Sequence, residues 1–233
     1  MKRILCSLAF CALGAGNSAA QGGGAAPARD GMAQRSAACV ACHGAQGRAT
    51  SAGYFPRIAG KPQAYLFNQL VNFRQGRRTN PSMNHLLAHL SDEYLAEIAA
   101  YFAAQRPPYA PARAAGASRA TLARGERLAT AGDPARKVPA CIACHGQKLA
   151  GVLPAVPGLL GLSRDYLNAQ FGGWRNGVRR ASKPDCMAHV ANRLAPSDVA
   201  AVAAWLLAQP VPADYSAEPA GAAALPMACG GVQ

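Results

Sequence analysis

Apolar positions recur with helical spacing in two pairs of segments. Residues 58–78 and 159–179 carry apolar side chains at intervals of three and four positions, and so do residues 90–105 and 194–209. This spacing gathers the apolar side chains on one face of an α-helix. Ser91 and Ser197 are placed to cap the helices of the second pair. The pattern therefore predicts an all-α protein.

The members of each pair resemble one another, which indicates an internal repeat. Residues 58–78 align with residues 159–179 at an offset of 101. Matched positions of the repeat include Tyr65 with Tyr166, Leu66 with Leu167, Gln69 with Gln170, Phe73 with Trp174, Ile98 with Val202, and Phe102 with Leu206. The stretch between the copies is rich in proline and alanine and predicts an extended linker. The chain is thus predicted to hold two copies of one small helical domain.

The first twenty residues have the features of a secretory signal. Lys2 and Arg3 precede a short apolar stretch, and the small residues Ser18 and Ala20 come just before Gln21. The stretch is too short for a membrane-spanning helix, which needs about 20 apolar residues. Residues 1–20 are therefore predicted to be a signal peptide. The mature protein is expected in the periplasm, soluble or peripherally associated with the membrane.

The charge balance indicates an acidic partner. The formal net charge is +13 and the isoelectric point is about 9.8. Because an exported protein does not meet DNA, we exclude nucleic acid and expect a protein with an acidic docking surface. Basic side chains gather beside residues 80–90 and 184–194: Arg74, Arg77, Arg78, Arg175, Arg179, Arg180 and Lys183.

Two five-residue motifs carry the strongest chemical signal. "CVACH" at residues 39–43 and "CIACH" at residues 141–145 both show the C-x-x-C-H pattern of covalent c-type haem attachment. The two thiols of each motif add to the vinyl groups of a porphyrin, and the histidine binds the iron. A zinc ribbon would separate its C-x-x-C pairs by about 15–20 residues, far less than the spacing here. Two haem c groups are predicted, attached through Cys39, Cys42, Cys141 and Cys144, with His43 and His145 as axial ligands.

The second axial ligand is less certain from the residues alone. Met83 and Met187 occupy the same place in the two copies, and a thioether is a soft donor that raises the potential of haem iron. Histidine also recurs, since His85 and His189 each follow the methionine by two positions. Cys186 adjoins Met187 and can bind a metal too. The residues alone do not decide whether methionine, histidine or Cys186 is the second axial ligand.

Two cysteines remain in the mature chain after haem attachment. An even remainder in an oxidising compartment tends to pair, so we predict a disulfide between Cys186 and Cys229. Such a bond would fasten residues 211–233 beside the second haem. The composition of this tail predicts no fold of its own.

The sequence of the first copy resembles a known family. "FPRIAGKPQAYLFNQLVNFRQGRRTNPSM" at 55–83, followed by "LSDEYLAEIAAYFAAQRP" at 90–107, is similar to the dihaem cytochromes of the c4 type. The resemblance covers about residues 28–210. It implies two tandem class I cytochrome c domains, 21–106 and 120–210, joined by a Pro/Ala-rich linker, 107–119, and followed by the tail, 211–233.

The resemblance also implies a ligand set. His43 and His145 are expected as proximal ligands, with Met83 and Met187 as distal ligands. The carbonyl groups of Pro56 and Pro157 are expected to accept hydrogen bonds from the proximal imidazoles and so fix the orientation of each ring.

A closed ligand set decides the expected function. Two six-coordinate irons leave no place for a small-molecule substrate, so we expect a periplasmic electron carrier. Its donor would be a quinol-oxidising complex or a dehydrogenase, and its acceptor would be a terminal oxidase or reductase. Its partners would therefore be redox proteins, and it could associate peripherally with a membrane complex. The alternative is a small dihaem enzyme or a dedicated dehydrogenase subunit, for example in sulfur-compound oxidation, with a labile distal ligand at one haem.

Overall fold

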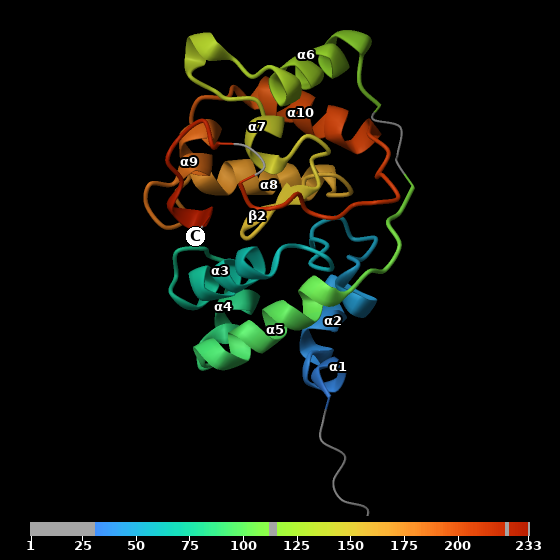
Figure 1. Cartoon of the computed structure of the whole chain (residues 1–233), viewed down its shortest axis with the longest axis vertical. Coiled ribbons are helices and arrows are strands. Elements are labelled where there is room, and N and C mark those ends of the chain that lie inside the picture. The colour runs from blue at the N-terminus through green and yellow to red at the C-terminus, as the bar shows by residue number, and fades with distance from the viewer. Residues whose placement is uncertain (1–30, 112–115, 222–223, 233) are drawn as a thin grey trace, which may run out of the picture. The chain divides into compact units, whose positions relative to one another are not determined.

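The structure, a computed structural model, describes residues 31–111, 116–221 and 224–232. The predicted signal peptide lies outside the described residues. From Gly31 onward the chain forms one compact unit, and almost all of its regular structure is helical, which confirms the all-α prediction (Figure 1). Within the described residues, no helix is both long and apolar enough to cross a bilayer.

The first half of the unit, residues 31–111, is held together by α3 and α5. Its elements are α1 (Met32–Arg35), α2 (Ala37–His43), the 3-10 turn η1 (Ala45–Gly47), α3 (Gln63–Arg74), α4 (Pro81–Leu87) and α5 (Asp92–Ala104). The apolar face of α5 packs on α3, as the helical periodicity predicts. Leu95 and Phe102 are almost fully buried there.

The second half, residues 116–232, repeats this arrangement and adds a small hairpin. Its elements are α6 (Arg119–Thr130), η2 (Pro134–Arg136), α7 (Ile142–His145), β1 (Gly151–Val152), β2 (Val156–Pro157), α8 (Arg164–Arg175), α9 (Cys186–Ala191), α10 (Pro196–Ala208) and η3 (Gly230–Val232). Strands β1 and β2 pair antiparallel. Helix α10 packs on both α6 and α8. A Cβ atom on Gly125 would lie 2.2 Å from the carbonyl oxygen of Ala201, so glycine permits the close crossing of α6 and α10.

One of the two predicted helix caps is wrong. Ser91 caps α5 by accepting a hydrogen bond from the backbone amide of Tyr94 (3.3 Å). Ser197, however, lies inside the first turn of α10, because Pro196 starts the helix and Ala195 is the N-cap. The carboxylate of Asp198 accepts the amide hydrogen of Ala195 instead (3.0 Å).

Asp198 also joins three segments of the second half. It is 6% exposed, and it accepts hydrogen bonds from Arg124 Nε (2.8 Å) and Arg136 Nη1 (2.7 Å). These two guanidinium groups hold the pKa of its carboxyl at about 2, against the cost of burial. The ion pairs therefore connect α6, η2 and α10.

Replacing Asp198 by asparagine is expected to lower the free energy of unfolding by about 2 kcal/mol. Removing one partner of a buried ion pair costs more, but both arginines keep a third of their side chains in water. Since the folded pKa is depressed, this contribution is complete above the unfolded pKa of about 4 and is lost as pH falls through 2. Urea unfolding at several pH values measures both effects. Asp214→Asn, at an exposed carboxylate, is the control and should change nothing measurable.

The C-terminal tail packs on the second half, which its composition did not predict. The Tyr215 hydroxyl accepts a hydrogen bond from the amide of Leu160 (2.9 Å) and donates to the carbonyl of Leu149 (3.0 Å). Glu218 forms a parallel bridge with Val152 at the hairpin. Figure 1 shows the tail crossing the second half below β2 and ending near α9. Backbone and side-chain bonds therefore hold the segment, together with the packing of Val211 and Tyr215 on the core.

The end of the tail is tied to both halves. The sulfur atoms of Cys186 and Cys229 are bonded, and their Cα atoms lie 5.0 Å apart. The amide of Gly230 donates to the carbonyl of Pro184 (2.9 Å), and Asn68 Nδ2 of α3 donates to the carbonyl of Gly231 (3.3 Å). The tail thus fastens the segment before Met187 to the first half.

Candidate functional site

One cavity brings the predicted site residues of both copies together. Its volume is about 440 Å³, and its walls are mostly apolar. Every predicted haem-binding or iron-binding residue lines it: Cys39, Cys42, His43, Met83, Cys141, Cys144, His145 and Met187. The four motif cysteines form no disulfide. Residues far apart in the chain therefore meet in one apolar space.

Both motif histidines are held by a proline carbonyl. His43 ends α2 and its Nδ1 donates to the carbonyl of Pro56 (2.9 Å), while His145 ends α7 and its Nδ1 donates to the carbonyl of Pro157 (2.7 Å). The bond leaves Nε2 as the ring nitrogen that can bind a metal. Burial lowers the pKa of both imidazoles, which favours the neutral form that binds iron.

The surroundings of the motif thiols favour their protonated form. Burial raises the pKa of Cys141 to about 11 and also raises the pKa of Cys39 and Cys144. A zinc or thiol-redox site instead lowers the pKa of its cysteines. The surroundings therefore suit thiols that become thioethers better than thiolates that hold a metal.

Each methionine lies in a short, capped helix. The side chain of Asn80 caps α4 by accepting the amide hydrogen of Met83 (3.1 Å). In α9 the side chain of Asp185 accepts the amide hydrogen of Ala188, next to Met187 (2.9 Å). The caps fix the start of each helix and so fix where the thioether enters the cavity.

The other candidate distal ligands are engaged elsewhere or lie off the cavity. His85 is exposed, and neither His85 nor His189 is among the residues that line the cavity. His189 Nε2 donates to the carbonyl of Lys137 (3.1 Å). Cys186 lines the cavity, but its sulfur is bonded to Cys229. The geometry favours Met83 and Met187, and the ligand set stays a prediction.

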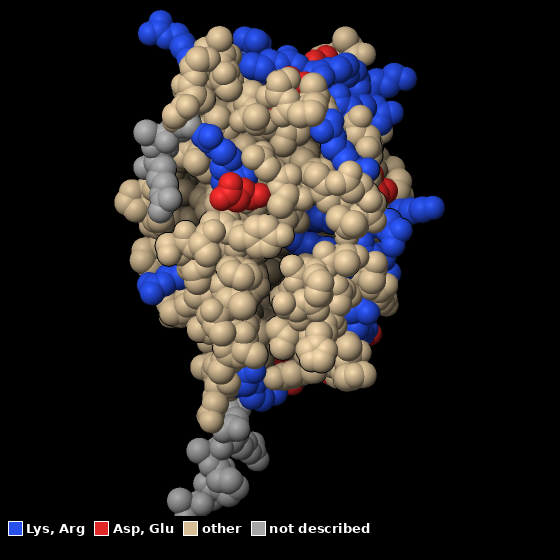
Figure 2. Space-filling view, turned by 180° about the vertical axis from the view of Figure 1, so that it is seen from behind, with Lys and Arg blue, Asp and Glu red and all other residues tan. Residues whose placement is uncertain are grey.

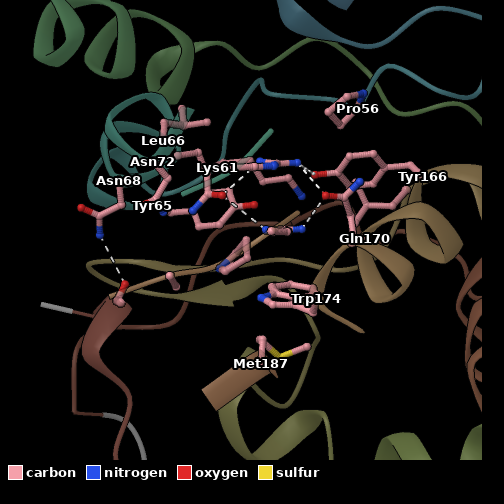
Figure 3. Close-up of a pocket in the computed structure, with 18 of the residues that line it drawn as sticks. Pro56, Lys61, Tyr65, Leu66, Asn68, Asn72, Tyr166, Gln170, Trp174 and Met187 are labelled. Atoms are coloured by element: carbon pink, nitrogen blue, oxygen red, sulfur yellow. Dashed lines mark hydrogen bonds between the residues drawn. The ribbon is translucent and has the colours of Figure 1, made fainter. Parts of the chain in front are cut away.

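Two buried arginines meet where the halves join. Arg78 and Arg179 face each other in an antiparallel bridge, and each is only 8% exposed. Arg78 Nη2 and Arg179 Nη1 both donate to Gln170 Oε1 (2.7 Å each). Arg78 Nη2 also donates to the hydroxyl of Tyr166 (3.1 Å) (Figure 3). All of these acceptors are neutral oxygens.

The expectation that the predicted basic cluster lies on the surface is therefore wrong for these two residues. Both lie in the contact between the halves, where the repeat places equivalent positions opposite each other. Arg74 pairs with Asp92, and Arg175 donates to the carbonyl of Ala191 (3.0 Å). The sequence could not predict the burial of Arg78 and Arg179, because hydropathy does not distinguish an arginine that lines a buried cavity from an arginine on the surface. Of the seven basic residues, only Arg180 and Lys183 are exposed.

The buried arginines make the cavity suited to a group with carboxylates. Two like charges out of water are costly without an anion, and no carboxylate of the described residues pairs with either. Trp174 Nε1 is also buried, with no hydrogen-bond partner among the described residues. The guanidinium carbon of Arg179 lies 3.8 Å from the Trp174 ring centroid. Haem c carries two propionates, and Arg78, Arg179 and Trp174 are the residues that would hold them.

Sequence reasoning missed two further residues of the cavity. Met227 lines it from the tail, and Figure 3 places Lys61 near its centre. The composition of the tail predicted no fold, so it gave no reason to place Met227 at the site. The repeat contained a signal for Lys61, because the aligned position in the second copy is the apolar residue Leu162.

Comparisons with known proteins identify the family. The family described as cytochrome C oxidase, cbb3-type, subunit III matches residues 26–102. A thiosulfate dehydrogenase electron acceptor of Thiomonas intermedia is 40% identical over 78% of this chain and 82% of its own length. Cytochrome c4 of Pseudomonas aeruginosa is 36% identical over 74% of this chain and 84% of its own. The crystal structure of reduced cytochrome c4 from Pseudomonas stutzeri superposes with a TM-score of 0.66 at 31% identity, covering 76% of this chain and 95% of that one.

The helical fold and the paired C-x-x-C-H motifs define a dihaem c-type cytochrome built from two tandem class I domains. The chain belongs to the cytochrome c4-type family. It binds two haem c groups covalently, and it is an electron-transfer protein with redox protein partners. The domain boundaries predicted from the sequence stay predictions.

Proposed function

We propose that this protein is a periplasmic electron carrier that accepts electrons from a thiosulfate-oxidising dehydrogenase and delivers them to a terminal oxidase or reductase. Each haem would carry one electron, so one chain would take up two electrons before it reduces its acceptor. His43 and His145 would be the proximal ligands, and Met83 and Met187 the distal ligands.

The observation that carries the proposal is that two imidazoles and two thioethers line one apolar cavity. An imidazole fixed by a proline carbonyl and a thioether on a capped helix are available to each haem. Iron with two protein ligands has no place for a substrate, but it gains and loses electrons readily. The low polarity of the walls limits the solvent rearrangement that accompanies each transfer.

Relatives support the choice of donor. The Thiomonas intermedia relative and a second one from Stutzerimonas stutzeri, 41% identical over 72% of this chain, are both named thiosulfate dehydrogenase electron acceptors. Both are more similar in sequence than the cytochromes c4 that match. The donor is therefore proposed to be a dehydrogenase of this kind.

The surface supports docking through charge. Figure 2 shows Lys and Arg side chains gathered over the second half, whereas much of the visible face of the first half is uncharged. Exposed basic residues of the second half include Arg119, Arg127, Lys137 and Arg193. We call these four the exposed basic residues of the second half. They would orient the protein toward an acidic surface of its partner, and salt would weaken the attraction.

The proposal is tested by following haem reduction. Ferric protein is mixed with a thiosulfate dehydrogenase and thiosulfate, and the reduced haem absorption is recorded. Two reduced haems per chain are expected, at a rate that falls several-fold when salt rises from low to physiological strength. Arg127→Glu should slow the reaction. Arg35→Glu, at an exposed arginine of the first half, is the matched control and should not.

Reduction that proceeds equally well without the dehydrogenase, or that ignores both salt and Arg127→Glu, would contradict the proposed donor and docking face. Chemical reduction of the same sample by dithionite checks that both haems are competent.

The enzymatic alternative has less support from the site. A catalytic haem needs a ligand that leaves readily, and Cys186 and His189 were the candidates for that role. Cys186 is bonded to Cys229, and His189 donates to the carbonyl of Lys137 (3.1 Å). The carrier is therefore the function that the geometry supports best.

A further inference from the structure

Lys61 is a first-half residue that reaches into the second half. It belongs to the loop before α3, and it is only 4% exposed. Its Nζ donates a hydrogen bond to the carbonyl oxygen of Gly158 (2.7 Å), 97 positions further along the chain. It also lies 5.8 Å from the ring centroid of Tyr215 in the tail. Three separate parts of the chain therefore enclose this amine.

The acceptor of Lys61 adjoins the group that orients the second proximal histidine. Gly158 follows Pro157, and the carbonyl of Pro157 accepts the hydrogen bond of His145 Nδ1 (2.7 Å). The amine of Lys61 therefore lies one peptide unit from the carbonyl that orients His145. Lys61 also lines the cavity that contains His145. The charge is thus placed beside the proximal side of the second haem site.

The charge on Lys61 has no anionic counterpart among the described residues. No carboxylate of those residues forms an ion pair with it, and its nearest charged neighbour is Arg57, another cation. A buried cation resists the addition of positive charge nearby, because the low-dielectric surroundings screen it weakly. Oxidation of a haem adds one positive charge to its iron. A cation at this position therefore favours the reduced state.

The two copies differ at this position. The residue of the second copy aligned with Lys61 is Leu162, so no lysine of the second half can reach the first proximal histidine in the same way. The buried cation that acts on His43 is Arg78, which belongs to the first half itself. Lys61 and Arg78 both cross from the first half to the second: Lys61 donates to Gly158, beside Pro157, and Arg78 donates to Tyr166 and Gln170.

We infer that Lys61 tunes the second haem from across the contact between the halves, raising its reduction potential above the value it would have without this charge. Lys61 is a positioning residue, since it acts through the field at the iron and through the Gly158 loop. The inference rests on the proposed role of His145 as the proximal ligand.

The test is a spectroelectrochemical titration of the wild type and three variants, all as full-length holoproteins at pH 6, in which each iron gives up one electron to the mediator. Burial lowers the pKa of Lys61 to about 7, so the amine is charged under this condition. The variants are Lys61→Met, Lys61→Arg, and Lys148→Met as a matched control at an exposed lysine of the second half. Met83→His in a separate sample moves the first haem to low potential and so assigns the two waves.

Lys61→Met should shift the second haem to lower potential, by a fivefold to tenfold change in its oxidation equilibrium, where tenfold is about 59 mV for one electron. The first haem should not move, and Lys148→Met should leave both waves in place. Lys61→Arg keeps the charge and should keep most of the wild-type potential. The shift should persist at high salt, because the charge is buried.

Three results would overturn the inference: an unchanged second wave in Lys61→Met, an equal shift in Lys148→Met, or equal shifts in Lys61→Met and Lys61→Arg. The last would show that packing, and not charge, is responsible. Haem content and the Soret spectrum of each variant establish that it folds. Two bound haems without the expected shift would contradict this inference and leave the proposed electron carrier intact. A spectrum without the signature of histidine bound to the second iron would contradict the proposed function itself.

Discussion

Replacing Cys186 and Cys229 together by serine is expected to lower the free energy of unfolding by about 4 kcal/mol. The estimate follows from the sequence separation of 43 residues, because a cross-link restricts the unfolded chain in proportion to the logarithm of the loop it closes. The hydrogen bonds of Tyr215 and Gly230 are weak substitutes for the cross-link. Urea unfolding, followed by Soret absorption, measures the difference.

A local effect should accompany the loss of stability. Because Cys186 directly precedes Met187 and starts α9, release of the tail should loosen the segment that presents this thioether. The near-infrared band of methionine-bound ferric haem should then weaken for the second haem and stay unchanged for the first. Wild-type protein that is treated with a disulfide reductant, alkylated at the freed thiols and then reoxidised at the haems should behave like the double variant, and the same treatment should leave the double variant unchanged. A loss of stability below about 1 kcal/mol would mean that the bond does not hold the tail.

Met187→His is expected to lower the potential of the second haem by on the order of 0.1 V, since axial ligands set haem potentials over a range of about 0.8 V. Met187 lines the cavity at the start of α9, and an imidazole stabilises ferric iron more than a thioether does. Potentiometric titration of both haems is the measurement. The first haem should keep its potential within experimental error.

Met227→Leu is the matched control for this change. Met227 lines the same cavity from the tail, so its replacement removes a second thioether without touching α9. Its potentials should match those of the wild type. If Met227→Leu lowered the second potential and Met187→His did not, the distal ligand would come from the tail.

The residues of the haem sites could be predicted because covalent attachment fixes their spacing in the sequence. Two thiols and a histidine must lie on one turn to meet one porphyrin, so "CVACH" and "CIACH" are informative without any tertiary structure. The prolines came from the family resemblance. In the structure both carbonyls accept the bonds expected of them, at 2.9 Å for Pro56 and 2.7 Å for Pro157.

What could not be predicted depends on contacts between distant segments. Arg78 and Arg179 look like surface residues until the two copies are placed together, where each donates to a glutamine of either half. Ser197 looked like a cap, but Pro196 shifts the start of the helix by its fixed φ angle. The tail is held by backbone pairing and single side chains, which leave no hydrophobic periodicity to detect.

Small differences between the copies carry the asymmetry of the molecule. Phe73 of the first copy matches Trp174 of the second, and only the tryptophan can donate a hydrogen bond into the cavity. Lys61 matches Leu162, so this buried charge has no equivalent in the second copy. A repeat therefore builds two similar sites, and single substitutions make them different.

The central claim, that both irons are closed by one histidine and one methionine, is tested most directly by the near-infrared spectrum of the purified ferric protein. The intensity of the methionine-sulfur-to-iron charge-transfer band is counted per haem, with the haem content determined independently. The account predicts intensity for two methionines per chain. Intensity for one methionine or for none would contradict it, because one iron would then have another ligand or an open site.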